Sequence, residues 1–196
     1  MKKALLLLAA VVLASVMAFN QNPGPGPETP EYTAKGELKL PEQYREWVYL
    51  STGMDMSYTA GGNPDHHMFD NVFVNPASYK KFQETGTWPD KTMLVLEVRG
   101  AERTSINQRG NSQSAEVMGI EVHIKDEAKF PGKWAFFSFD NGKIGSLFPA
   151  GAACYTCHQS HAAVDTTFVQ FYPTLLPIAK SKGTLSAEYV KESAAK

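Results

Sequence analysis

The sequence predicts a mainly β domain of the α+β class: an antiparallel sheet accompanied by a few short helices. Residues 91–99 form a nearly continuous apolar run of side chains that favour strands. Residues 117–125 alternate apolar and polar side chains, as a half-buried strand does. Glycine, proline and asparagine mark turns between such stretches, and no internal repeat is present. A chain of 196 residues therefore fits one domain with additional segments at its ends.

Strands are expected at residues 47–52, 71–74, 91–99, 117–125 and 134–139. Alternation places Leu96 on one face of its strand and Glu97 on the other. Along the next strand, it places Ile120 on an apolar face and Glu121 with His123 on a polar face. We therefore expect His123 to point toward solvent.

The helices are expected to be short. Residues 41–48 fit a helix with proline in its first turn. Residues 76–86 fit a second helix, with Asn75 as its N-cap and Gly86 at its end. A short apolar helix or turn is expected after Pro173.

The N-terminus carries the pattern of a secretory signal peptide over residues 1–18. Lys2 and Lys3 precede an apolar run, and small residues lead up to Ala18 as the cleavage position. We therefore expect a periplasmic protein, anchored in the membrane only if this segment is not cleaved. A formal net charge of −1 does not indicate binding to nucleic acid.

Two further segments flank the expected domain at residues 35–180. Residues 19–34 are a linker rich in proline and glycine, which cannot join a packed hydrogen-bond ladder. Residues 181–196 are polar and are expected to form a loosely held tail.

The most informative motif lies late in the chain, at residues 154–158. The chain has two cysteines, Cys154 and Cys157, and His158 follows the second directly. Two thiols at this spacing, with a histidine after them, form the attachment signature of a c-type haem. Each thiol adds across one vinyl group of the porphyrin, and the short loop between them leaves the imidazole as the proximal iron ligand. The spacing predicts one covalent haem c enclosed by the sheet and its helices.

Three other interpretations of the cysteine pair remain open. A zinc site would need two further ligands at metal-binding spacing, and no second cysteine pair exists. A thioredoxin-like redox pair normally opens a helix after a strand in a βαβ unit, which the flanking residues do not suggest. A disulfide between Cys154 and Cys157 would close a very short loop and stabilise little. Of these interpretations, haem attachment alone gives His158 a role.

The chain resembles the cytochrome P-460 family over residues 36–177. The resemblance is carried by YREWV (44–48), VFVNPASY (72–79), WAF (134–136), CYTCH (154–158) and DTTFVQFYP (165–173). It implies an antiparallel sheet around one c-type haem, usually in a homodimer. It also implies a five-coordinate iron with His158 on the proximal side and an open distal side.

The resemblance implies roles for two strand residues as well. In the hydroxylamine-oxidising members a lysine is joined covalently to the haem edge, and Leu96 stands at the matching position here. A distal carboxylate of those enzymes matches Glu121, whose pKa would rise on desolvation beside the haem. A sister branch, cytochrome c-prime-beta, has the same fold without the cross-link, has an apolar distal pocket and binds nitric oxide. Leu96 favours that branch, and Glu121 does not decide between the two.

Three functions remain open on this basis. The leading one is a periplasmic cytochrome whose five-coordinate haem binds a small ligand such as nitric oxide, or takes part in redox chemistry of small nitrogen compounds. The second is an oxidoreductase for hydroxylamine, with Glu121 as its catalytic base. The third is a six-coordinate electron-transfer cytochrome, with His66 or His67 as the distal ligand. Redox chemistry would require a redox partner protein, and the sequence does not decide whether the protein is an enzyme.

Overall fold

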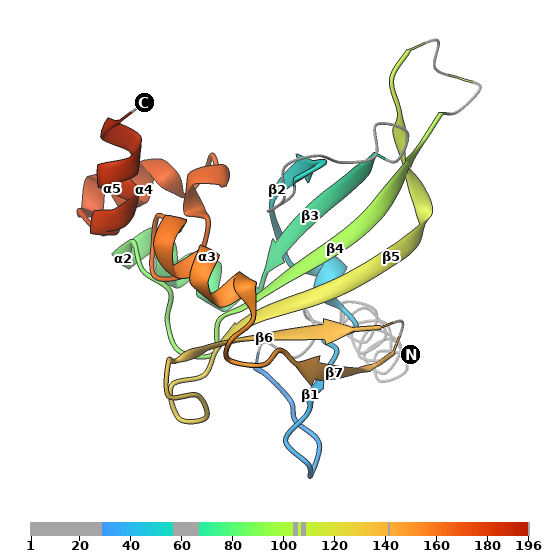
Figure 1. Cartoon of the computed structure of the whole chain (residues 1–196), viewed down its shortest axis with the longest axis horizontal. Helices are drawn as coiled ribbons and strands as arrows, with labels where there is room; N and C mark the ends of the chain where they lie inside the picture. Colours follow the sequence, from blue (N-terminus) through green and yellow to red (C-terminus); the bar gives the residue numbers. More distant parts are fainter. Residues whose placement is uncertain (1–28, 57–66, 104–105, 107–108, 141, 196) are drawn as a thin grey trace, which may run out of the picture.

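The computed structural model describes residues 29–56, 67–103, 106, 109–140 and 142–195. The predicted signal peptide, most of the linker and His66 lie outside the described residues. The described strands form a seven-stranded sheet in the order β1-β7-β6-β5-β4-β3-β2 (Figure 1). Each neighbouring pair is antiparallel, which confirms the predicted mainly β architecture.

The strands are β1 (Leu38–Lys39), β2 (Val48–Met54), β3 (Met68–Val74), β4 (Met93–Glu102), β5 (Ser112–Lys125), β6 (Trp134–Phe139) and β7 (Ile144–Leu147). The helices are α2 (Pro76–Thr85), α3 (Ala153–His161), α4 (Leu176–Lys182) and α5 (Ala187–Ala194), with 3-10 turns η1 (Tyr44–Glu46) and η2 (Val169–Phe171). All of the predicted strands are present. The sequence does not predict β1 and β7, because each is too short for alternation to be recognised.

One face of the sheet is closed by the N-terminal segment. Met93 and Val95 of β4 and Val122 of β5 are buried there, as alternation predicts. Tyr44 and Trp47 are buried against them. The predicted helix at residues 41–48 is therefore wrong in extent: it is a single 3-10 turn, because Trp47 is already extended and β2 begins directly after it.

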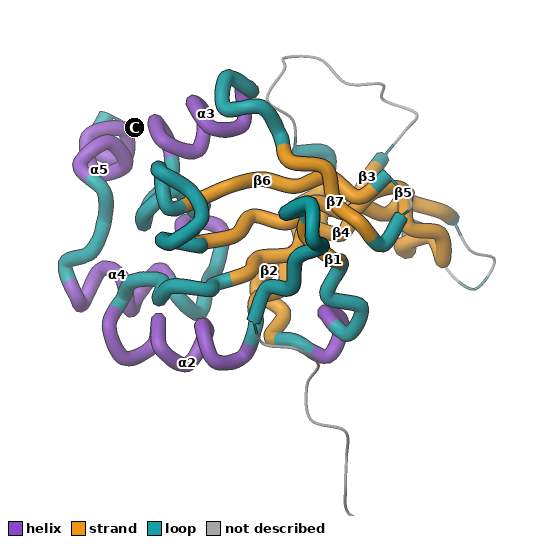
Figure 2. Tube along the Cα trace, turned by 90° about the horizontal axis from the view of Figure 1, so that it is seen from below, coloured by secondary structure: helices purple, strands orange, loops and turns teal. Residues whose placement is uncertain are grey.

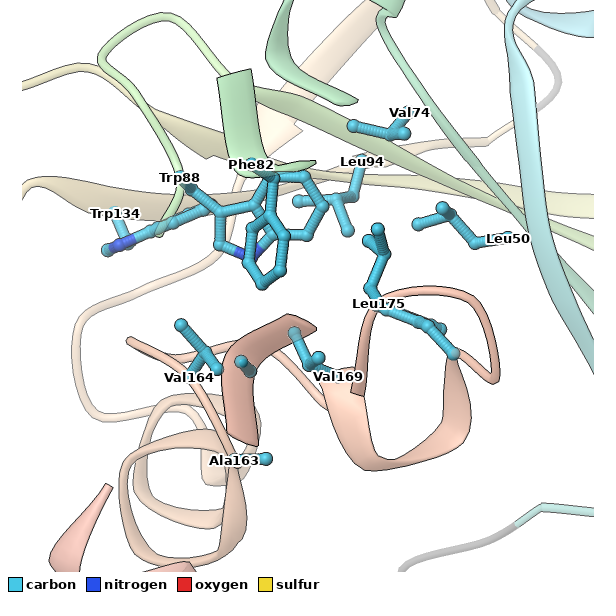
Figure 3. Packing of buried hydrophobic residues seen from close by; sticks show 12 residues of the cluster. Leu50, Val74, Phe82, Trp88, Leu94, Trp134, Ala163, Val164, Val169 and Leu175 are labelled. Carbon is cyan, nitrogen blue, oxygen red and sulfur yellow. The ribbon is translucent and has the colours of Figure 1, made fainter. Parts of the chain in front are cut away.

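The other face is covered by the helices, which gather at one end of the sheet (Figure 1, Figure 2). Leu94, on the same face as Leu96, belongs to this second core. The rings of Phe82 and Trp88 lie 4.3 Å apart between their centroids. Figure 3 shows them between the strand residues and the C-terminal residues that include Val164. Burying one such aromatic side chain stabilises the fold by about 1.5–3 kcal/mol.

Helix α2 closely matches the predicted helix, and it ends at Gly86 as expected. The backbone there has φ of +77°, and a Cβ atom would come within 2.7 Å of Lys182 Cβ, so the turn requires glycine. Asn75 is the N-cap residue, as predicted, but its side chain makes no capping hydrogen bond. Its side-chain oxygen instead accepts a hydrogen bond from the Met93 amide at 2.9 Å, which ties the helix start to β4.

The predicted loose tail is a docked helix instead. Ser186 caps α5 by accepting a hydrogen bond from the Tyr189 amide, and its own hydroxyl donates to the Ala162 carbonyl at 2.6 Å. Tyr189 packs against the core beneath the helices. Although this segment is mostly polar, Tyr189 anchors it in the core and Ser186 caps its helix, and together they dock it against α3.

The predicted linker also extends less far than expected. Tyr32 forms an isolated β-bridge with Leu38, and its hydroxyl donates to Asp126 at 3.0 Å. The ordered part of the domain thus includes residues before position 35. No helix in the described part of the chain is long and apolar enough to cross a membrane.

Candidate haem-attachment site

The cysteine motif lies within helix α3 rather than in the expected short loop. Cys154, Cys157 and His158 are spaced i, i+3 and i+4, which places them on one side of the helix. Both thiols are free. Burial is the main cause that raises the pKa of each thiol above its usual value. Both therefore stay protonated near neutral pH, unlike the thiolate of a catalytic redox pair.

The structure gives no support to the other interpretations of the pair. The sheet around α3 is antiparallel, so the helix does not belong to a βαβ unit. The free thiols form no disulfide. Among the described residues, no group of three or more histidine, cysteine and acidic side chains is placed to hold a metal ion. Attachment of a haem is the interpretation that accounts for the motif.

His158 is held in the tautomer that a proximal ligand needs. Its Nδ1 lies 2.7 Å from the carbonyl oxygen of Thr166. A carbonyl can only accept, so Nδ1 carries the proton and Nε2 carries the lone pair. Burial lowers the pKa of His158 to about 4, so the ring is neutral at physiological pH.

Three aromatic rings surround the imidazole of His158. Its centroid lies 4.2 Å from that of Phe168, 4.7 Å from Phe136 and 5.1 Å from His123. These rings come from β5, β6 and the segment after α3. Packed this closely, they limit rotation of the imidazole.

The solvent-facing position predicted for His123 is wrong. Its side chain is only 8% exposed and stacks on Phe136, with centroids 3.9 Å apart and planes 9° apart. Burial lowers the pKa of His123 well below its usual value. The polar side of the alternation in β5 is the face that α3 covers, and strand periodicity alone cannot reveal which face a helix will cover.

Leu96 and Glu121 lie on this same face of the sheet. They are direct partners in the pairing of β4 with β5, and Glu121 is two residues before His123. Along a strand this spacing corresponds to about 7 Å. Surrounding protein raises the pKa of Glu121, and the negative charge of Asp70 raises it further. The predicted effect of a bound haem on this pKa stays a prediction.

Asp70 is a residue of this face that sequence reasoning missed. It pairs with Val98 on β4, next to the pair of Val72 and Leu96. Burial raises its pKa, despite a hydrogen bond from the Met56 backbone. The available signal was its position in β3, two residues before Val72, but the predicted strand began at residue 71.

Two further histidines, the candidate distal ligand His67 and His161 of α3, lie elsewhere. His67 Nδ1 is 2.7 Å from Asp55 at the start of β3, and His161 Nδ1 is 2.9 Å from Glu192 of α5. Both of these side chains are well exposed to solvent. Within the described ranges, the structure therefore places neither His67 nor His161 where a distal ligand would be.

Surface hollows do not define the site. One hollow of about 480 Å³ is lined by residues around Leu40 and Ile144, and another of about 430 Å³ lies between β2 and Pro173. Neither is lined by the residues of α3. The candidate site is instead the sheet face beside α3.

The residues present fit a c-type haem. The two free thiols lie one helical turn apart, and the histidine next to them has its Nδ1 proton directed to a carbonyl. Cys154 and Cys157 would hold the porphyrin, and His158 would hold the iron. Leu96, Glu121 and Asp70 would face the group from the sheet.

Comparison with known proteins supports this assignment of the fold and the cofactor. No curated protein matches the chain. The family model described as Cytochrome P460 matches residues 41–169. This match covers more than half of the chain, from the segment before η1 to the turn that contacts His158. The chain therefore belongs to the cytochrome P460 family, which makes it a haem protein.

Proposed function

We propose that this protein is a periplasmic monohaem cytochrome c that binds a small ligand such as nitric oxide. The observation that carries the proposal is the hydrogen bond from His158 Nδ1 to the Thr166 carbonyl. His158 directly follows Cys157, the second of the two free cysteines. This bond holds the proton on Nδ1 and leaves the lone pair of Nε2 free to bind iron. The signal pattern at residues 1–18 supports export across the cytoplasmic membrane, and c-type haems are attached on the far side of that membrane.

The chain would hold its cofactor from α3 alone. Cys154 and Cys157 would hold the porphyrin through two thioether bonds, and His158, on the same side of the helix, would provide the proximal nitrogen. The bound haem supplies an iron that takes small π-acceptor ligands. Phe136 and Phe168 keep water from the His158 ring by packing around it.

Leu96 supports ligand binding rather than a cross-linked chromophore. Its side chain is hydrocarbon and cannot form the covalent bond that a lysine makes to the haem edge. An apolar side chain here also favours a neutral diatomic ligand over ligands that need hydrogen-bond donors. The family resemblance supports a homodimer, and a redox partner would supply the electron that keeps iron ferrous.

Measurements of haem attachment and of ligand binding test this proposal. Intact mass and a pyridine haemochrome spectrum should show one haem with two thioether bonds, and the Cys154→Ala/Cys157→Ala variant should lose it. Ser160→Ala on the same helix is the matched control and should retain it. The reduced protein should give a high-spin spectrum that changes on adding nitric oxide. A low-spin spectrum without added ligand would contradict the proposal.

Glu121 favours a second candidate function, the oxidation of hydroxylamine. Conversion of hydroxylamine to nitric oxide releases three protons and three electrons, and a one-electron acceptor protein would take the electrons. A carboxyl whose pKa is raised by desolvation and by Asp70 is suited to accept protons. Turnover with an added acceptor dye, and its loss in Glu121→Gln with haem retained, would support this function. Wild-type protein without turnover would remove it.

A further inference from the structure

His123 lies against His158, the candidate iron ligand. It comes from β5 in the centre of the sheet, whereas His158 comes from α3. The two rings meet edge to face, with centroids 5.1 Å apart and planes 75° apart. The stack on Phe136 fixes the plane of the His123 ring. A polar ring is thus placed in a core position that a phenylalanine or leucine could fill.

Thr166 connects the two histidines through two different atoms. Its carbonyl oxygen accepts the hydrogen bond from His158 Nδ1 at 2.7 Å. Its side-chain oxygen Oγ1 lies 3.2 Å from His123 Nε2. Any displacement of Thr166 therefore changes the geometry of the bond to His158, and the contact with His123 restrains Thr166.

The turn that presents Thr166 is itself fixed by the core. Val164 and Thr167 pair across it, and the Thr167 amide donates to the Val164 carbonyl at 2.9 Å. Asp165 adopts φ of +52°, an uncommon conformation for a residue other than glycine. Trp88 Nε1 donates to the Thr167 hydroxyl at 2.7 Å. The segment is therefore anchored on both sides of Thr166, and the remaining freedom is the orientation of Thr166 itself.

We propose that His123 is a positioning residue for His158: acting through Thr166, it sets the strength of the hydrogen bond that His158 donates and so tunes the iron. This inference rests on the proposed attachment of haem to α3. A proximal histidine becomes a stronger electron donor when its Nδ1 proton is held firmly by an acceptor. A stronger donor stabilises ferric iron more than ferrous iron and lowers the reduction potential.

Two substitutions interrupt the connection without removing the Thr166 carbonyl. Thr166→Val replaces the hydroxyl with a methyl group of nearly the same size. His123→Phe keeps an aromatic ring against Phe136 and removes the nitrogen. Thr166→Ser restores the hydroxyl, and His161→Phe on the exposed side of α3 is the matched histidine control.

The test uses the full-length, haem-loaded proteins. Haem content is first measured by the pyridine haemochrome spectrum, and folding by circular dichroism. The reduction potential and the iron–histidine stretching frequency of the ferrous form are then compared. We expect Thr166→Val and His123→Phe each to lower this frequency. Each should also raise the reduction potential. At a fixed applied potential the ferric-to-ferrous ratio should fall at least threefold, which corresponds to a rise of about 28 mV for a one-electron couple.

The pattern across variants distinguishes positioning from core packing. The double variant should show no larger shift than either single variant, because both interrupt one connection. Thr166→Ser and His161→Phe should match the wild type. Haem-loaded Thr166→Val with wild-type frequency and potential would overturn this inference, even if His123→Phe fails to fold. A wild-type protein without haem would overturn the proposed function, and this inference with it.

Discussion

Leu96 on β4 and Glu121 on β5 are direct partners across neighbouring strands, on the same face of the sheet as His123. One side chain is apolar and the other is an acid with a raised pKa. A ligand bound beside them would therefore meet a hydrocarbon side chain from β4 and a carboxyl group from β5 that can exchange protons. This contrast leads to the first two predictions.

Replacing Leu96 with glutamine should change which ligands the ferric protein binds. The new amide can donate a hydrogen bond to an anionic ligand, and bonds of that kind contribute about 1.5–3 kcal/mol. We expect fluoride to bind at least tenfold more tightly, as measured by absorbance titration. Leu96→Met is the matched control because it preserves volume and apolarity, and unchanged fluoride affinity in Leu96→Gln would place residue 96 away from the ligand.

The reduction potential should depend on pH through Glu121. Burial, and then the charge of Asp70, raise its pKa, so its proton is lost above the usual value of about 4.3. The charge that appears as pH rises stabilises ferric iron, so the potential should fall through this window. Glu121→Gln should abolish the fall, and Asp70→Asn should move it to lower pH. Redox titrations between pH 4 and 8 measure both effects, and an unaltered fall in Glu121→Gln would assign the dependence to another group.

The opposite face of the sheet carries a buried charge cluster that should govern acid stability. Glu97 is 2% exposed and is bound by Tyr44, Arg45 and Arg99. Burial alone would raise the pKa of Glu97, but the bonds from Arg99, Tyr44 and Arg45 outweigh it and lower the pKa. Its contribution to stability is therefore present above the usual pKa of a glutamate and is lost as pH falls through the lowered value.

Glu97→Gln should lower the free energy of unfolding at pH 7 by about 3 kcal/mol, near the lower end for a broken buried pair because Arg45 is half exposed. The variant should also lose less stability than the wild type between pH 4 and 3. Urea unfolding at pH 7, 4 and 3 measures this difference. Glu46→Gln, which alters an exposed acid in η1, is the control and should behave as the wild type. Equal acid sensitivity of wild type and Glu97→Gln would contradict the assignment.

The turn that contacts His158 should depend on one buried hydroxyl. Thr167 accepts a hydrogen bond from Trp88 Nε1 and donates one to the Val164 carbonyl at 2.8 Å. Thr167→Val would leave the buried indole nitrogen without this acceptor, which costs about 1–3 kcal/mol. Thermal unfolding should show this loss, while Thr167→Ser should lose clearly less. A Thr167→Val protein as stable as the wild type would contradict this role of the hydroxyl.

The C-terminal helix should stabilise the domain through packing rather than through its surface charges. Truncation before Ser186 removes the Tyr189 ring from the core and the bond from Ser186 to Ala162. Glu192→Gln removes an exposed ion pair with His161, and such pairs contribute at most about 1 kcal/mol. Urea unfolding should therefore show that the truncation lowers the free energy of unfolding several-fold more than Glu192→Gln does. A truncated protein as stable as the wild type would restore the interpretation of this segment as a loose tail.

Much of the candidate site was predictable because it is local in sequence. The spacing of Cys154, Cys157 and His158 does not depend on distant parts of the chain, and neither does the two-residue alternation that separates Leu96 from Glu97. His123 was assigned to the wrong environment, and Asp70 was missed. Both errors concern what covers a strand face, and the covering helix is separated from these strands by many residues.

The sequence by itself determined the antiparallel β class, the strand positions and the residues that would attach a haem. Only the tertiary structure decided that the polar side of β5 is the covered side, that Thr166 joins His123 to His158, and that residues 187–194 form a docked helix. The physical reason is that periodicity separates the two faces of a strand but carries no information about which face another element will bury. That choice is made by long-range packing, in which the aromatic rings around His158 and the anchor at Tyr189 are brought together.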